Sequence, residues 1–346
     1  MLFLLIVLHS GVSFIVIEVD TWFYYDSSNH ILFDGVLGFI HAIRIPSFFI
    51  VSGYLIEQML HNRSKRKVLS KRFKRIFIPL MIVVFTLCPI VNGLFALLNG
   101  FPNGFSFSTM FPRGEYIHFL FNTSYVWFLY YLFLYNVFHV LLYKLKALPF
   151  VVNINIVWRI CALLLVISGV LILYEKEALY GDYGLIPAAY SLGGYFLFYL
   201  FGVSIRLQND DLLKIRSFAS YFLFMGVTCI SVYFILKYRE MLNPSHTFQL
   251  PIVIVYTLSS VFLALSFMGF TLRFYTKQSK WVKYISDASY FIYLIHFPIL
   301  LCFLWLLSYV NLNPFLKFLL ILCPTLALCL LMNRLWLKIW RGSPPL

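Results

Sequence analysis

Two histidines and one arginine stand inside long apolar runs, where an ionisable side chain is costly. His9 lies in the first run, and His41 and Arg44 lie three residues apart in the second. An imidazole with an ordinary pKa of about 6.5 can take a proton from a hydroxyl near neutral pH. Arg44 stays charged, so inside a membrane it requires an anion, a cluster of carbonyls or a wet cavity. We interpret the three as a candidate catalytic group for chemistry at a hydroxyl and a carbonyl or carboxylate.

Each of these residues also has a structural interpretation, which stays open. His9 could be a neutral histidine that hydrogen-bonds a neighbouring helix, and Arg44 could extend toward a membrane interface. His139 lies late in its apolar run, where a structural role is favoured. Glu57 precedes a basic segment and is expected to neutralise it.

Arg72 and Arg75 close the basic segment 61–75. Their spacing predicts two guanidiniums on one helical face, and such a pair can clamp a phosphate group. The alternative is that they only set topology, since basic loops of membrane proteins stay in the cytoplasm. Ser52-Gly53-Tyr54 and His296 lie in further apolar runs, where their alternatives are helix packing and a core histidine.

The elements that hold these side chains must lie in a membrane. Of 346 residues, 62% are hydrophobic and 12% are charged, and the mean hydropathy is +0.87. A soluble domain is only about 45–50% apolar. The net charge of +14 lies largely between apolar runs, which suits a membrane surface better than nucleic acid. The six cysteines lie in or beside apolar runs without a CxxC pattern, so we interpret them as buried core residues.

A helix needs about 20 apolar residues to cross the hydrocarbon core. The sequence predicts an all-α, polytopic integral membrane protein with about ten transmembrane helices, in a single domain over residues 1–346. The expected spans lie near 1–17, 36–60, 76–98, 125–143, 156–174, 186–206, 218–236, 250–270, 288–308 and 315–337. Most of the 27 lysines and arginines then lie on the side of segment 61–75, opposite most acids and the long segment 99–124. By the positive-inside rule, both termini are expected in the cytoplasm.

Several short motifs follow one another along the chain. They are His9, Phe48-Phe49-Ile50-Val51-Ser52-Gly53-Tyr54, Arg72-x-x-Arg75, Tyr125-Val126-Trp127-Phe128-Leu129, Tyr199-Leu200-Phe201-Gly202 and Ser289-Tyr290-x-x-Tyr293-Leu294-x-His296. In this order the set resembles membrane acyltransferase family 3. Within the family, His41-Ala42-Ile43-Arg44-Ile45-Pro46 looks most like the branch of glucan biosynthesis protein C, which is similar to a succinyltransferase.

The resemblance implies a membrane O-acyltransferase of the bacterial inner membrane. It would move an acetyl or succinyl group from a cytoplasmic acyl-CoA to a hydroxyl of a periplasmic or cell-surface glycan. Acetyl-CoA or succinyl-CoA is the expected cosubstrate, and no bound cofactor or metal is expected. The glycan and the lipid bilayer are the expected partners, nucleic acid is not, and the oligomeric state stays open.

The resemblance also implies roles for single residues. His9 would be the base, Arg44 and His41 would complete the catalytic group, and the phosphates of CoA would lie on Arg72 and Arg75. Substrate-binding side chains are expected at Ser52, Tyr54, Trp127 and His296.

One family feature has no counterpart in the sequence. The family usually has an arginine about three helical turns before the first-span histidine, a position that would precede Met1. Either the first span continues upstream or the chain lacks this arginine.

Two other functions stay open. One is a transporter or flippase for the glycan without acyl transfer, because buried Arg and His also mark substrate paths. The other is a non-catalytic membrane scaffold. The sequence contains no GxSxG, Walker or HExxH pattern, so it gives no support to soluble-type hydrolases and nucleotide hydrolases.

Overall fold

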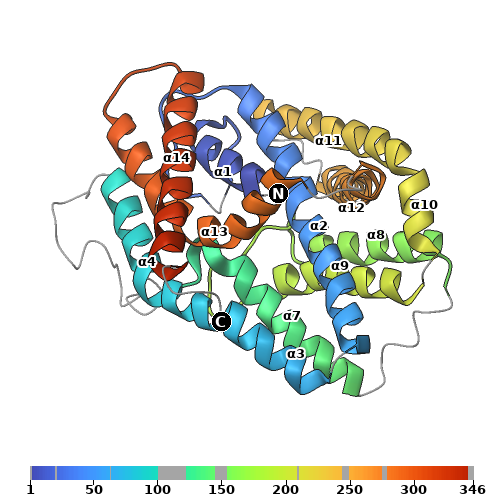
Figure 1. Cartoon of the computed structure of the whole chain (residues 1–346). Helices are drawn as coiled ribbons and strands as arrows, with labels where there is room; N and C mark the ends of the chain where they lie inside the picture. Colours follow the sequence, from blue (N-terminus) through green and yellow to red (C-terminus); the bar gives the residue numbers. More distant parts are fainter. Residues whose placement is uncertain are drawn as a thin grey trace. The chain divides into compact units, whose positions relative to one another are not determined.

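The computed structural model describes residues 2–19, 22–62, 64–99, 122–144, 154–208, 210–243, 249–274 and 279–341. Within these ranges the regular elements are all helices, which confirms the all-α expectation (Figure 1). Of the sequence-based expectations, Arg63 and most of the long segment 99–124 lie outside the described residues.

Eight helical stretches of the described residues are long and apolar enough to cross a bilayer, so the multi-pass expectation is confirmed. Their helices are α2 (Ile31–Asn62), α3 (Lys65–Arg72) continuing through the π-helical turn η2 (Phe73–Phe77) into α4 (Ile78–Leu98), η4 (Ser124–Val126) with α7 (Trp127–Lys144), α8 (Ile156–Leu173), α11 (Ala219–Leu242), α12 (Gln249–Phe274), α13 (Lys280–Ser308) and α14 (Pro314–Arg341).

The first and sixth expected spans coincide with helices that are not among these eight. The first is α1 (Leu2–Gly11), prolonged by the 3₁₀ turn η1 (Val12–Phe14), and it is described over too few residues. The sixth is α9 (Ala189–Leu207), whose serines, glycines and tyrosines make it less apolar. A short helix, α10 (Asp211–Ser217), follows it.

The chain forms two compact units, and each is described by itself. Unit 1 comprises Met1–Leu37, Ile82–Val126 and Lys277–Leu346, and unit 2 comprises Gly38–Met81 and Trp127–Thr276. In unit 1, α1 packs on α13 and α14, and its Ile6 is buried with Ile292 and Cys329. The single domain over 1–346 stays a prediction.

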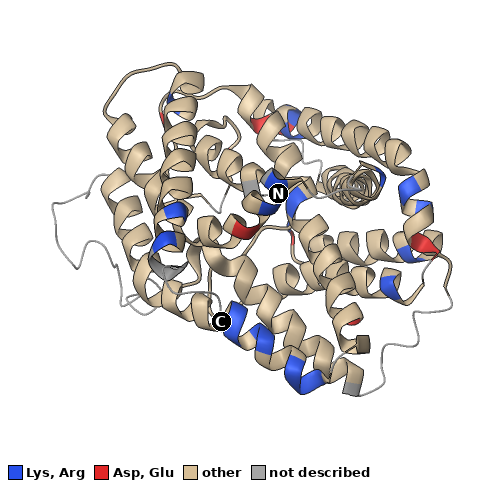
Figure 2. Cartoon of the chain, viewed as in Figure 1, with Lys and Arg blue, Asp and Glu red and all other residues tan. Residues whose placement is uncertain are grey.

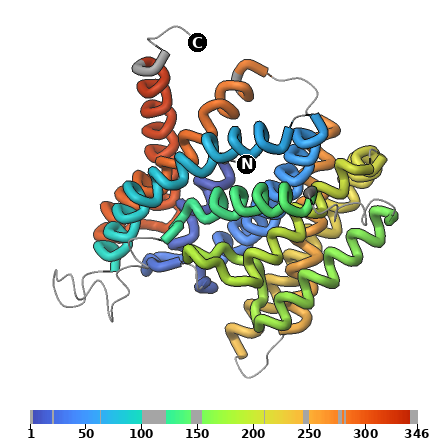
Figure 3. Tube along the Cα trace, turned by 90° about the horizontal axis from the view of Figure 1, so that it is seen from below, coloured from blue at the N-terminus to red at the C-terminus, as the bar shows by residue number. Residues whose placement is uncertain are grey.

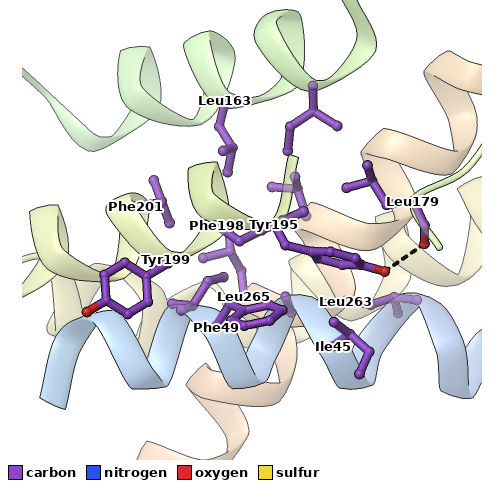
Figure 4. Close-up of a cluster of buried hydrophobic side chains, with 14 of the residues drawn as sticks. Ile45, Phe49, Leu163, Leu179, Tyr195, Phe198, Tyr199, Phe201, Leu263 and Leu265 are labelled. Atoms are coloured by element: carbon purple, nitrogen blue, oxygen red, sulfur yellow. Dashed lines mark hydrogen bonds between the residues drawn. The ribbon is translucent and has the colours of Figure 1, made fainter. Parts of the chain in front are cut away.

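The core of unit 2 is built around α9 and is rich in aromatic rings. Figure 4 shows Tyr195 and Phe198 of α9 packed with Phe49 of α2, and Leu263 and Leu265 of α12 lie beside them. Tyr195 does not waste its polar end, because its hydroxyl donates to the carbonyl of Leu179 at 2.7 Å.

Two glycines bring α2 and α9 into backbone contact. A Cβ built on Gly53 would lie 2.0 Å from the Tyr199 carbonyl oxygen, and one on Gly202 would lie 1.9 Å from that of Ile50. Any side chain at either position would overlap the opposite backbone. The Gly53 and Gly202 motifs therefore set the distance between these two helices, as small residues do in membrane helix pairs.

The helix that carries the basic residues runs beside α7 in unit 2. Figure 3 shows α3 and η2 alongside α7, and the two contact each other. Phe77 and Phe133 pack at the contact, with ring centroids 4.7 Å apart. This packing holds the region of Arg72 and Arg75 against the body of unit 2.

The six cysteines do not all behave as expected. Cys88, Cys229 and Cys329 are buried and Cys161 is partly buried, but Cys302 and Cys323 are exposed, so the expectation of buried core residues is wrong for these two. The physical reason is that the outer face of a membrane helix is itself apolar. An apolar neighbourhood in the sequence therefore does not distinguish the core from the lipid face.

Arg159 is a buried cation that no sequence pattern singled out. Its guanidinium donates to the Ile154 carbonyl, to Ser204 Oγ and to Gln208 Oε1, and it forms an ion pair with Asp211. These bonds satisfy the arginine and join α8, α9 and α10. Such a network is structural.

We expect Asp211→Ala to lower the melting temperature of the purified protein strongly, because it leaves Arg159 buried without its counter-charge. Breaking one partner of a buried pair costs about 3–5 kcal/mol. Asp210→Ala, at the exposed neighbouring position, is the matched control and should melt like the wild type. An unchanged melting temperature for Asp211→Ala would contradict a structural role for the network.

Candidate active site

His9 lies in the last turn of α1 and is surrounded by aromatic rings in unit 1. Trp22 stacks on it with centroids 6.1 Å apart, and Phe297 meets it edge-on at 4.9 Å. The ring of His296 lies 5.6 Å away. The structure therefore brings together the first-span and ninth-span histidines, which are far apart in the sequence, in one largely apolar cluster.

The tautomer of His296 follows from its surroundings. Its Nδ1 lies 2.8 Å from the carbonyl oxygen of Tyr293, and a carbonyl can only accept. Nδ1 therefore carries the hydrogen, and in the neutral ring Nε2 carries the basic lone pair. His296 is completely buried, so this assignment does not depend on bulk water.

Tyr125 and Tyr293 hold the neighbouring backbone segments together in unit 1. The Tyr125 hydroxyl donates to the Leu294 carbonyl, and the Tyr293 hydroxyl donates to the Tyr125 carbonyl at 3.1 Å. Tyr125 also stacks on Phe297 with centroids 4.8 Å apart. The two tyrosine motifs named in the sequence thus support the turn of α13 that carries His296.

The segment 15–30, which we call the strap, holds Trp22 against His9. Trp22 Nε1 donates to Ser13 Oγ at 3.0 Å. Further along the strap, Lys317 Nζ of α14 lies 2.8 Å and 2.9 Å from the two carboxylate oxygens of Asp26. Both charges are almost fully buried. The strap is therefore fixed on both sides of Tyr24.

Two further groups complete the strap. Asp34, in the first turn of α2, accepts from the backbone N–H groups of Val16 and Ile17. Burial beside the Asp26 carboxylate raises the pKa of Tyr24 to about 12, so this phenol stays neutral. Sequence reasoning missed Trp22, Asp26 and Lys317; a lysine within an apolar run was the one available signal.

His41 and Arg44 lie together in unit 2. His41 Nε2 donates to the Leu179 carbonyl at 3.0 Å, and this oxygen also accepts from the hydroxyls of Tyr195 and Tyr256. Arg44 is buried, and its charge acts on His41 and Tyr195. One nitrogen of His41 is therefore committed to structure, which leaves Nδ1 for any acid–base role.

The expected substrate-binding residues of unit 2 differ in accessibility. Ser52 is partly exposed, and the ring of Tyr54 lies 6.0 Å from the guanidinium carbon of Arg206. Trp127 is almost buried, and its indole lies on the backbone at Gly181, where a Cβ would be 2.0 Å from the ring. Packing accounts for Trp127, while the position of Tyr54 beside a cation suits an anionic ligand.

Arg72 and Arg75 have different surroundings. Figure 2 shows lysines and arginines along α3 and on α10. Arg72 is partly buried and its Nη2 lies 3.4 Å from Met59 Sδ, whereas Arg75 is exposed. The π-helical turn that begins at Phe73 is wider than an α-helical turn, so it rotates Arg75 away from the face of Arg72. The two guanidiniums share one region but not one helical face.

Glu57 does not neutralise the basic segment as the sequence suggested. It is buried, and its carboxylate lies 2.8 Å from Nε2 of His139. His9 and His296 belong to unit 1, and His41, Arg44 and Arg72 belong to unit 2. A single centre made of His9, His41 and Arg44 therefore stays a prediction.

Eight apolar helices, with imidazoles and guanidiniums buried among them, define a polytopic membrane protein that carries acid–base groups at membrane depth. Residues 1–334 match the family described as an acyltransferase domain, acyltransferase family 3, and the chain belongs to it. The protein is thus a membrane acyltransferase by family. No curated protein and no solved structure matches the chain, and the branch of glucan biosynthesis protein C is not confirmed.

Proposed function

We propose that this protein transfers an acetyl or succinyl group from a cytoplasmic acyl-CoA to a hydroxyl of a periplasmic or cell-surface glycan. It would act in the inner membrane of a bacterium, with both termini in the cytoplasm. Its membership of the acyltransferase family supports the reaction class. The concentration of lysine and arginine on α3 supports a cytoplasmic position for the CoA phosphates.

The observation that carries the proposal is the His9–His296 cluster in unit 1. In the proposed reaction, His9 takes the proton of the acceptor hydroxyl while its oxygen attacks the thioester carbonyl. The C–S bond then breaks, and the thiolate of CoA receives the proton. Trp22 and Phe297 exclude water from His9, which favours attack by the glycan over hydrolysis.

Arg44 offers the buried positive charge that an acyl carbonyl or a succinyl carboxylate would need. A succinyl donor would use it more fully, because a carboxylate can bind a guanidinium with two parallel hydrogen bonds. An Arg44→Lys variant would lose this second bond and keep the charge.

The direct test uses purified protein in lipid nanodiscs, labelled acetyl-CoA or succinyl-CoA, and a glycan fraction as acceptor. Transfer of label to the glycan is the expected result, and a succinyl product would also bind an anion-exchange resin. Label that never moves, while glycan crosses protein-containing vesicles, would favour a transporter. Surface glycans unchanged in a His9→Ala strain would favour a scaffold.

Arg72→Ala should raise the KM for acyl-CoA about ten- to hundredfold, because a hydrogen bond to a charged group contributes about 1.5–3 kcal/mol. Arg75→Ala should have a smaller effect, since Arg75 is exposed and screened by solvent. The matched control is Arg66→Ala, at an exposed position on the same helix. Equal effects of Arg66→Ala and Arg72→Ala would indicate a general surface charge instead of a phosphate site.

A further inference from the structure

Three buried side chains in unit 2 form a hydrogen-bonded chain that the proposed reaction does not use. Glu57 lies on α2, His139 on α7 and Tyr199 on α9. The Glu57 carboxylate lies 2.8 Å from His139 Nε2, and the Tyr199 hydroxyl lies 3.2 Å from His139 Nδ1. His139 and Tyr199 are completely buried and Glu57 is 6% exposed, so water hardly competes for these groups.

The chain has one consistent direction. A carboxylate can only accept, so His139 Nε2 carries a hydrogen and donates it to Glu57. In the neutral imidazole the other nitrogen is then an acceptor, so the Tyr199 hydroxyl donates to His139 Nδ1. The oxygen of Tyr199 therefore keeps its remaining lone pairs for a cation.

Arg72 is a cation in the right place to use them. Its charge acts on the Tyr199 hydroxyl, and so does the charge of Glu57. A protonated His139 would donate from both nitrogens and turn the tyrosine hydrogen outward, which a nearby guanidinium disfavours. The sulfur of Met59, which accepts a hydrogen bond from Arg72, is a weak acceptor and orients a guanidinium poorly.

We propose that Glu57, His139 and Tyr199 are positioning residues that aim the Arg72 guanidinium at the phosphates of acyl-CoA. The inference rests on the proposed function of Arg72. It explains why an acid is buried beside the basic segment without meeting its exposed charges. It also explains why the Tyr199 motif lies at the close crossing of α2 and α9, where Gly53 contacts the Tyr199 backbone. A purely structural tie among α2, α7 and α9 is the rival explanation.

The test compares Tyr199→Phe with Ser204→Ala. Both residues are buried on α9, and Ser204 belongs to the structural network, where its Oγ accepts from Arg159 Nη1 at 2.9 Å. Binding of CoA itself, the KM and kcat of acyl transfer, and the melting temperature are measured on the full chain in nanodiscs. For Tyr199→Phe we expect CoA binding and KM to weaken about tenfold, with kcat within about twofold.

Ser204→Ala should lower the melting temperature and leave CoA binding unchanged. Glu57→Gln, which keeps the shape and removes the charge, should weaken CoA binding about threefold and decides the question if Tyr199→Phe does not fold. Unchanged CoA binding in both Tyr199→Phe and Glu57→Gln would overturn the inference. If Arg72→Ala weakens CoA binding in that case, only this inference fails. A wild type that neither binds CoA nor transfers label would overturn the proposed function with it.

Discussion

We expect purified His9→Gln protein to transfer acyl groups about a hundred- to ten-thousandfold more slowly than the wild type. Glutamine keeps a polar group of similar size but cannot take a proton near neutral pH. The ring contacts of His9 with Trp22 and Phe297 would be lost, while the hydrogen bond of Trp22 to Ser13 would remain. The measurement is the single-turnover rate with labelled acyl-CoA, at concentrations that saturate CoA binding.

His61→Gln is the control, because His61 is exposed in the last turn of α2. It should react at the wild-type rate. His296→Gln identifies which ring acts as the base, since its Nε2 also carries a lone pair. Full loss in His296→Gln with a nearly intact rate in His9→Gln would contradict the assignment of His9.

Gly202→Ala should prevent stable folding of unit 2. A methyl group at this position would lie 1.9 Å from the Ile50 carbonyl oxygen, and backbone cannot move aside as a flexible side chain can. Ordinary overpacking costs about 1–3 kcal/mol, and a backbone overlap should exceed that range. The expected result is aggregated or rapidly degraded protein on expression, or a melting temperature far below that of the wild type.

Gly193→Ala is a matched control on the same helix, because no atom lies within 4 Å of the position that its methyl group would take. It should fold normally and gain slightly from higher helix propensity. Two alanine variants that melt alike would contradict the close crossing of α2 and α9. A Gly202 variant with wild-type stability and lost activity would move the role of this motif from packing to chemistry.

Much of the fold could be predicted from the apolar runs, because a membrane imposes a minimum helix length. The ends of α2 and α3 differ from the expected spans because amphipathic turns extend both helices beyond the apolar core. α1 and α9 were harder to assess. α9 is less apolar because its glycines and tyrosines serve contacts inside unit 2, which hydropathy does not measure.

The candidate site could be predicted only where one residue looked out of place. His9 and His296 could be singled out in this way, and the structure shows their rings together. Trp22 could not, because a tryptophan in a loop has no distinctive spacing. The pairing of Asp26 with Lys317 joins residues that are far apart in the sequence, and one sequence alone contains no information on such a pair.

His139 shows the opposite error. Its place late in an apolar run favoured an inert role, yet it bonds Glu57 and Tyr199 at once. Arg72 and Arg75 were expected on one face because an α-helix was assumed throughout. A π-helical turn has no reliable sequence signal, so the departure could be seen only in the structure.

The π-helical turn at Phe73–Phe77 behaves as a one-residue insertion within an otherwise regular rod. Removing one residue there would restore regular winding and rotate Arg72 by about 100° relative to Ile78. Hydropathy, length and net charge would scarcely change, yet the guanidinium would leave Tyr199. In related chains, the length of this stretch should therefore vary less than its amino acids do, and a relative that lacks the extra residue would have to carry its inner cation at a shifted position.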